Sequence, residues 1–256
     1  MCGGSTSIKF NPDTDIPALT GKVILVTGGT NGLGKESILQ LAKHEPAEIW
    51  MGARNAEKVQ TAINDIQESV PKSVSIKFLH IDLGSFASIS EAATVFKKHS
   101  LRLDILMLNA GIMITPAGLT EDGYEIQFGT NHMGHALLTK LLLPILSSTA
   151  ALPDSDVRVV IKAVSVHPGM VKTNLGNESA SKSLLLRTAL NVARAVVGVD
   201  VATGAITQLW AAMGKDVKAG EYYEPIGVTG RGSEWAADEE LGDKLWEWTQ
   251  NQIEGY

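Results

Sequence analysis

Cysteine is almost absent from this chain, since Cys2 is the one cysteine among 256 residues. A disulfide framework and a cysteine metal cluster are therefore excluded, and a reducing compartment, the cytoplasm, is the expected location. Positive charge is also in deficit: 28 acidic residues against 22 Lys and Arg leave a net charge of −6, which argues against nucleic acid as a partner. No apolar run reaches the roughly 20 residues of a membrane span, so we expect none.

What remains is the composition of a soluble globular protein. Hydrophobic residues make up 44% and charged residues 20% of the chain, and this length suits a single α/β domain. Residues 1–19 are polar and interrupted by glycine and proline, and we expect them to form a flexible N-terminal arm. Residues 20–256 are expected to form the domain.

The stretch 22–34 organises the rest of the chain. It opens with an apolar, mostly β-branched run at 23–26, which is typical of a strand buried on both faces of a parallel sheet. A glycine-rich turn and a helical pattern over 36–44 follow. Because a glycine backbone can approach a diphosphate closely and a helix start offers unpaired N–H groups, the turn is a candidate phosphate-binding loop. An ordinary strand-to-helix turn has the same pattern.

The spacing of the glycines narrows this choice. Gly28, Gly32 and Gly34 are set as G-x-x-x-G-x-G within the string TGGTNGLG, which resembles the cofactor loop of the short-chain dehydrogenase/reductase family. The resemblance implies a Rossmann-type, doubly wound parallel sheet and a dinucleotide cofactor. It also implies that Gly28, Gly32, Leu33 and Gly34 hold that cofactor, and that a small-molecule alcohol or carbonyl is the substrate.

The end of the second expected strand indicates which dinucleotide binds. Residues 47–54 read AEIWMGAR and close on Arg54, with no acid until Glu57. Folds of this kind that use NAD commonly place an acid here for the ribose 2′-hydroxyl, whereas the 2′-phosphate of NADP favours a cation. We therefore expect NADP(H) with Arg54 at the phosphate, the alternative being that Arg54 is a solvated surface residue. Lys35 either adds positive potential or faces solvent.

Two further strand ends carry expected cofactor residues. The strand at 74–81 runs into Asp82, which can accept from an adenine amino group or cap the helix that starts near Ser85. The strand at 103–108 closes on Asn109-Ala110-Gly111. In the family that this sequence resembles, that triplet braces the sheet and lines the adenosine ribose. The resemblance thus implies roles for Asp82 and Asn109 at the cofactor.

Residues 123–146 contain the one expected catalytic group. Asn131 lies where the family keeps an asparagine whose helix is locally distorted to hold a water in the proton relay. His132 and His135 have the spacing of a metal pair, but no carboxylate or cysteine accompanies them at ligand spacing, and we expect no metal. Pro144 is expected to bend or end the helix.

The chain departs from the family within residues 156–167, DVRVVIKAVSVH. The first half resembles the family's fifth strand, and the second half, which leads into Pro168, resembles its sixth. The serine-bearing loop and the Tyr-x-x-x-Lys helix that the family carries between these strands would lie between Ile161 and Lys162. The chain has four tyrosines, and none has a lysine four residues on: Tyr124, Tyr222, Tyr223 and Tyr256.

This gap has chemical and structural consequences. Proton transfer loses its usual phenol, and general acid–base assistance is worth roughly 10²- to 10⁴-fold in rate. Because neighbouring parallel strands need a crossover of about a dozen residues, we expect a sheet that is one strand and one crossover helix short. In the family that this sequence resembles, the missing helix packs beside the helix at 131–146, and in many relatives it builds the dimer interface. We therefore expect Leu137, Leu141 and Leu142 to be exposed, and a homo-oligomer to lack that interface.

The remainder follows the family again. Val171 and Thr173 fall where relatives hold the carboxamide and diphosphate of the cofactor. We expect two helices in the substrate-lid region, a last strand and a terminal amphipathic helix: 184–197, 202–213, 221–225 and 238–250. In the last of these, Trp246 and Trp248 are expected to pack rather than to bind a ligand.

Within the family, the sequence most resembles the retinol-dehydrogenase-like group and its relatives in fungal secondary metabolism. Three hypotheses about its function remain. The first is an NADP(H)-dependent reductase whose sequence has lost a segment by splicing or exon misassignment, which the clean edges of the gap favour. The second is a non-catalytic NADP(H)-binding or partner-binding protein. The third is an enzyme with a substitute proton donor, either His167 or a residue from a partner chain.

Overall fold

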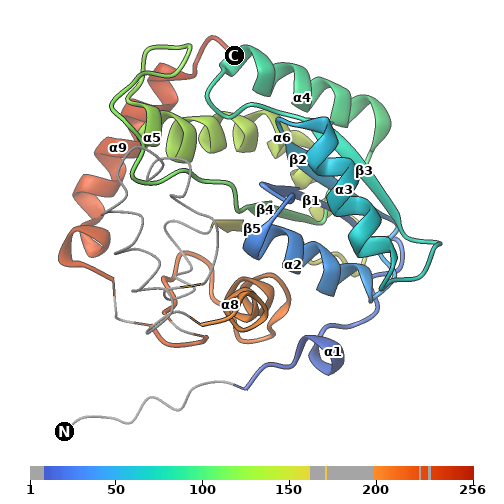
Figure 1. The fold of residues 1–256 in the computed structure, drawn as a ribbon. Coiled ribbons are helices and arrows are strands. Elements are labelled where there is room, and N and C mark those ends of the chain that lie inside the picture. Colours follow the sequence, from blue (N-terminus) through green and yellow to red (C-terminus); the bar gives the residue numbers. More distant parts are fainter. Residues whose placement is uncertain (1–8, 162–170, 172–198, 225, 230–231) are drawn as a thin grey trace, which may run out of the picture.

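The computed structural model describes residues 9–161, 171, 199–224, 226–229 and 232–256. At its centre is a parallel sheet with the strand order β3-β2-β1-β4-β5 (Figure 1). The strands are β1 (Val23–Thr27), β2 (Glu48–Ala53), β3 (Ser75–His80), β4 (Ile105–Leu108) and β5 (Arg158–Ile161). Within the described residues, no strand pairs with the outer edge of β5.

Helices connect and cover these strands. They are α1 (Pro12–Asp15), α2 (Gly32–Ala42), α3 (Ala56–Gln67), α4 (Phe86–His99), α5 (Ile126–Phe128), α6 (Gly134–Ala150), α8 (Val201–Met213) and α9 (Glu239–Gln252). A π-helical turn, Gly129–Met133, joins α5 to α6, and a short 3₁₀ helix, Glu234–Ala237, precedes α9.

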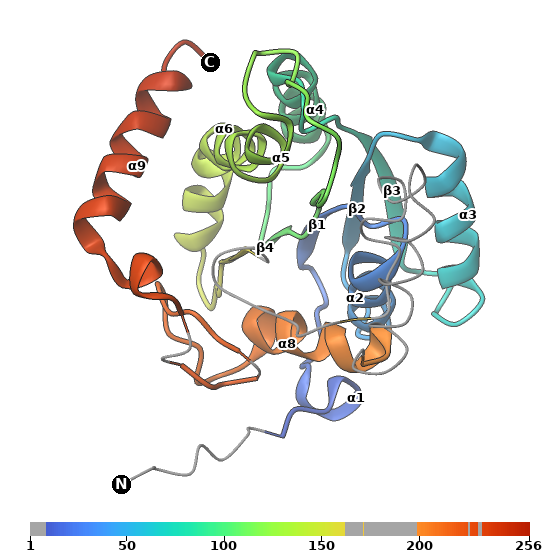
Figure 2. The ribbon, with the colours of Figure 1, turned by 60° about the vertical axis from the view of Figure 1, so that its left-hand side comes forward.

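Strand β1 shows why the sheet is covered on both faces. All of its residues are buried, and successive side chains point to opposite faces. Ile24 and Val26 belong to the core formed with α2, α3 and α8. Val23 and Leu25 belong to the core formed with α4 and α6, and Figure 2 shows α2 and α8 on one side of the sheet and α4 and α6 on the other. The expected Rossmann-type, doubly wound parallel sheet is confirmed.

A buried carboxylate joins β1 to β4 at the end of the sheet opposite the glycine turn. Asp104 accepts hydrogen bonds from the backbone nitrogen of Val23 at 3.0 Å and from Arg102 Nε at 2.7 Å, and its other oxygen lies 3.1 Å from Lys22 Nζ. Burial works against the charged form, but these donors hold the pKa of Asp104 below its usual range. The start of β1 is thereby fixed to the start of β4.

The exposure predicted for the helix after the π-helical turn is wrong. Leu137 and Leu142 are fully buried, and Leu141 is half-buried against the same core. The leucine of α6 that is exposed is Leu143, at 54%. Helix α6 covers its own face of the sheet beside α4, so its main apolar stripe does not depend on an additional helix. Pro144 does not end the helix, which continues to Ala150.

Two predictions for the C-terminal region also need correction. No strand forms at 221–224; Tyr223 is instead buried with its ring 4.7 Å from that of Trp210, and its hydroxyl accepts from the Lys218 nitrogen. Helix α9 forms as expected, but Trp246 is 63% exposed. The helix docks through Thr249 near its C-terminal end and through Ile253, the residue that follows it, whereas the residues of its first half are exposed.

Part of the expected N-terminal arm is packed against the domain. Helix α1 is capped by Asn11, and Ile16 and Leu19 are buried in the core with α2. The Leu19 nitrogen also donates to the carbonyl oxygen of His44. The helix expected at 184–197 lies outside the described residues, and none of the helices within them is long and apolar enough to cross a membrane.

Candidate functional site

The turn after β1 is built around glycines that no other residue can replace without strain. Gly28 and Gly32 have φ values of +69° and +52°, a region that L side chains rarely adopt. A Cβ on Gly28 would lie 2.8 Å from Ala110 Cα, and a Cβ on Gly34 would collide with the Gly28 carbonyl oxygen. The glycine spacing therefore marks two special backbone conformations, at Gly28 and Gly32, and two close approaches, at Gly28 and Gly34.

Helix α2 starts within this turn, at Gly32 rather than at residue 36. Its N-cap residue, Asn31, makes no side-chain hydrogen bond to the helix, so side-chain capping does not occupy the first N–H groups, which are suited to an anion. Leu33 is placed differently from its neighbours. Its side chain is buried in the core, and its carbonyl accepts from Gln208 Nε2, which leaves its backbone N–H as its contribution to the turn.

Asn109 holds the turn from the neighbouring strand. Its Nδ2 donates to the carbonyl oxygens of Thr27 at 2.8 Å and Gly28 at 3.2 Å. Its Oδ1 is buried with no partner, and a buried acceptor without a partner is costly. The glycine turn leaves open a space that a Cβ would fill, which we call the glycine cradle, and Asn109 Oδ1 lacks a donor. Both features fit a dinucleotide. Its diphosphate would lie along the glycine backbone, and its ribose carries hydroxyl donors.

Arg54 and Asp82 are brought together at the carboxyl ends of β2 and β3, which are neighbours in the sheet. Arg54 Nη1 lies 4.0 Å from Asp82 Oδ2, and its side chain is 64% exposed. Asp82 Oδ1 accepts from the Gly84 nitrogen. Helix α4 is capped by Ser85, so the alternative in which Asp82 caps that helix is wrong.

Asn131 lies in the π-helical turn, Gly129–Met133, and the predicted local distortion of its helix is confirmed. Its side chain clamps the chain just after β4: Oδ1 accepts from the Ile112 nitrogen and Nδ2 donates to the Ile112 carbonyl oxygen, both at 2.9 Å. Both ends of the amide are therefore occupied.

The two histidines of this helix have separate partners. His132 Nε2 lies 2.9 Å from Thr249 Oγ1, and burial lowers the pKa of His132. His135 is buried between Thr27 Oγ1 and the Asn131 carbonyl oxygen, each 3.0 Å from a ring nitrogen. Among the residues described here, no group of three or more His, Cys, Asp or Glu could hold a metal. Sequence reasoning missed the role of Thr27, although a hydroxyl that ends an apolar strand was a visible signal.

Two of the described phenols, Tyr124 and Tyr222, are not prepared for proton transfer. Tyr124 donates to Gln252 Oε1, and burial with Asp122 nearby raises its pKa. Burial and Glu224 raise the pKa of Tyr222 to about 12. An acid–base phenol needs a shift in the opposite direction.

Of the two remaining predicted cofactor residues, one lies within the described residues. Val171 is 9% exposed and forms an isolated β-bridge with Val199, whereas Thr173 lies outside the described residues.

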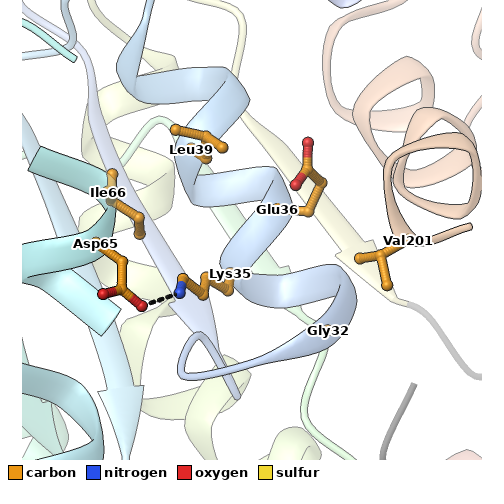
Figure 3. A pocket seen from close by; sticks show the side chains of 7 residues that line it. All are labelled: Gly32, Lys35, Glu36, Leu39, Asp65, Ile66 and Val201. Atoms are coloured by element: carbon orange, nitrogen blue, oxygen red, sulfur yellow. Dashed lines mark hydrogen bonds and ion pairs between the residues drawn. The ribbon is translucent and has the colours of Figure 1, made fainter. Parts of the chain in front are cut away.

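A cavity of about 330 Å³ opens between α2 and α3 beside Gly32 (Figure 3). There the Lys35 ammonium lies 2.5 Å from the Asp65 carboxylate, so an acidic partner already holds the charge of Lys35.

Comparison with known proteins decides the family. The sequence model of short chain dehydrogenases matches residues 22–160. A short-chain dehydrogenase/reductase of Armillaria gallica is 32% identical over 292 aligned positions, which cover 94% of this chain and 93% of that protein. The chain belongs to the short-chain dehydrogenase family. Human retinol dehydrogenase 13 is also related, with 43% identity over 133 residues, or 52% of this chain and 39% of that enzyme.

The fold agrees with a solved structure of low sequence similarity. A protein from Mycobacterium paratuberculosis superposes with a TM-score of 0.67 at 22% identity, covering 97% of this chain and 98% of that one. The alignment with the Armillaria relative has 292 positions, but 94% of this chain is only about 241 residues. About 50 positions of the alignment therefore have no counterpart in this chain.

Proposed function

We propose that this chain binds NADP(H) at the turn 28–34 and that its chemistry is hydride transfer between NADP(H) and a small-molecule alcohol or carbonyl in the cytoplasm. The observation that carries the proposal is the glycine cradle over which Asn109 presents an unpartnered Oδ1. Of the molecules that this family uses, a dinucleotide supplies both an anion for the cradle and a hydroxyl for that oxygen.

The preference for NADP(H) over NAD(H) rests on Arg54. It directly follows β2 and has an exposed guanidinium, and the nearest acidic atom among the described residues is 4.0 Å away on Asp82. A carboxylate at that distance orients the arginine without occupying all of its donors, so the guanidinium can bind a 2′-phosphate by charge-assisted hydrogen bonds.

We further infer that the acid–base half of the active site belongs to a segment that this sequence lacks. That segment would lie between Ile161 and Lys162. Three observations support this inference. The family match ends at residue 160, about 50 aligned positions of the Armillaria relative have no counterpart, and Tyr124 and Tyr222 have raised pKa values. As written, the chain is then a dinucleotide-binding protein with impaired catalysis. The second candidate is a protein that binds NADP(H) without turnover as its normal function.

A thermal melt tests cofactor binding. A ligand at a hundred times its Kd stabilises a folded binder by about 2.7 kcal/mol, which raises the Tm of a chain of this size by roughly 5 to 10 °C. We expect a cooperative transition that rises with NADPH more than with NADH. A transition that neither cofactor moves contradicts dinucleotide binding, and equal shifts contradict the role of Arg54.

Restoring the missing segment separates the two candidates. The corresponding residues of the Armillaria relative are inserted between Ile161 and Lys162, and NADPH oxidation is followed with retinal-type aldehydes and ketones. We expect turnover in the restored chain and none when the inserted tyrosine is changed to phenylalanine. If the transcript instead reads directly from the Ile161 codon to the Lys162 codon and the restored chain stays inactive, the non-catalytic candidate is correct.

A further inference from the structure

His135 connects two parts of the candidate site that the preceding sections treat separately. It is 5% exposed. Its Nε2 lies 3.0 Å from Oγ1 of Thr27, a residue 108 positions away at the end of β1. Its Nδ1 lies 3.0 Å from the carbonyl oxygen of Asn131, in the π-helical turn.

These partners fix the tautomer of the ring. A carbonyl oxygen can only accept, so Nδ1 carries the hydrogen. Burial lowers the pKa of His135 to about 4, so the ring is neutral at pH 7 and Nε2 accepts from the Thr27 hydroxyl. The other acceptor within reach of that hydroxyl, the Met107 carbonyl oxygen, is more distant at 3.4 Å.

The hydrogen bonds on both sides of His135 close into a ring. Thr27 Oγ1 accepts from the Ala110 nitrogen at 3.0 Å, and the Asn131 side chain holds both backbone groups of Ile112. Ala110 and Ile112 belong to one short segment. This segment is therefore hydrogen-bonded to Thr27 at one end and to Asn131 at the other. His135 is the bridge between these two residues on the opposite side.

A histidine that only filled volume would not need this arrangement. Burying a polar ring costs free energy unless each nitrogen finds a partner, and an apolar ring would occupy the same space without that cost. Both partners found here belong to the site: Thr27 directly precedes Gly28, and Asn131 is the expected catalytic residue.

We propose that His135 is a positioning residue that couples the cofactor turn to the turn carrying Asn131, so that ordering of one orders the other. The identity of the ligand at the cofactor turn rests on the function proposed above. The coupling itself is a property of the protein without ligand.

Amide hydrogen exchange in the ligand-free protein tests the coupling. The variants are Thr27→Val, His135→Phe and the double substitution. The decisive probe is the Ile112 amide, which is bonded to Asn131 and not to Thr27. We expect Thr27→Val to speed its exchange by about tenfold, the effect of losing a net hydrogen bond of roughly 1.4 kcal/mol. In the His135→Phe background, Thr27→Val should have no further effect at this amide.

Thr139→Val is the matched control. It also removes a hydroxyl from a bond with His135, but Thr139 Oγ1 donates to the backbone carbonyl and not to the ring. Exchange of the Ile112 amide should be unchanged in this variant. The proposal is overturned if Thr27→Val speeds the Ala110 amide alone, or if the Thr27→Val and His135→Phe effects at Ile112 add independently.

A second readout covers the case in which His135→Phe does not fold. Long-range ¹H–¹⁵N spectra of the wild-type chain report which ring nitrogen is protonated. We expect a hydrogen on Nδ1 of His135 at pH 7, and a hydrogen on Nε2 would overturn the proposal. Repeating the exchange with NADPH should protect Ala110 and Ile112 together. Failure of NADPH to bind would contradict the proposed function, while the ligand-free comparison would still decide the role of His135.

Discussion

Gly34 and Asn109 lie so close together that a Cβ on Gly34 would collide with the Asn109 amide nitrogen. That nitrogen bonds the carbonyl oxygens of Thr27 and Gly28, so Gly34→Ala is expected to push Asn109 out of the turn. We expect a loss of roughly 1 to 3 kcal/mol in unfolding free energy, as for overpacking, together with loss of the NADPH-induced rise in Tm.

Gly242→Ala is the control for this substitution. Gly242 is also helical, and a Cβ there would meet nothing within 4 Å. Alanine should therefore stabilise α9 by up to about 1 kcal/mol and leave the NADPH-induced shift unchanged. Equal behaviour of the two alanine variants would mean that the close approach at Gly34 is not essential.

Arg54→Ala should change cofactor preference rather than cofactor binding in general. A hydrogen bond to a charged group contributes about 1.5 to 3 kcal/mol, so we expect NADPH affinity to fall by roughly ten- to a hundredfold while NADH affinity stays the same. Fluorescence titration with both cofactors measures this. Lys35→Ala is the comparison, and a smaller change is expected because Asp65 holds the Lys35 ammonium. Parallel losses for NADPH and NADH in Arg54→Ala would rule out contact with the 2′-phosphate.

Acid should weaken the fold through His135. The folded-state pKa is lowered from 6.5 to about 4 because the ring is buried. Between pH 6.5 and pH 4 the histidine of the unfolded chain is protonated, whereas that of the folded chain stays neutral. The free energy of unfolding therefore falls as the pH drops from 6.5 to 4. The total loss is about 3 kcal/mol. Urea unfolding of wild type and His135→Phe over this range measures it, and the wild type should lose about 3 kcal/mol more than the variant between pH 6.5 and pH 4. Equal losses in the two proteins would mean that folding does not lower the pKa of His135.

The sequence was sufficient for the parts of the fold that depend on local pattern. The run at 23–26 predicted a strand buried on both faces, and the glycine spacing predicted the turn, because a positive φ and a close approach leave a residue-level signature. The distortion at Asn131 followed from resemblance alone, since nothing in its own periodicity indicates a π-helical turn.

Burial that depends on partners far along the chain could not be predicted. Leu137 and Leu142 were expected to be exposed on the assumption that a missing helix covers them, but they face the sheet and α4. The bonds between Thr27 and His135 join residues 108 apart, and no local spacing encodes such a contact. Long-range pairing is set by how the elements pack, not by the pattern within any one of them.

Trp246 and Trp248 test how far the attachment of α9 extends along the helix. Trp248 lies against Tyr124 and Phe128, with ring centroids 6.1 and 5.9 Å away, although it is 41% exposed. Trp248→Ala should therefore cost roughly 1 to 3 kcal/mol, less than the 3 to 5 kcal/mol of a fully buried ring. Trp246→Ala removes the same atoms from a side chain that is 63% exposed, and should stay within about 0.5 kcal/mol.

Urea unfolding of the two alanine variants makes the comparison, since the chemical change is identical and only the surroundings differ. If Trp246→Ala costs as much as Trp248→Ala, the Trp246 ring is covered in solution by a surface outside the described contacts. Repeating the measurement at tenfold lower protein concentration then identifies that surface: a cost that disappears on dilution means that a second copy of the chain covers the ring, and a cost that persists places the cover within the same chain.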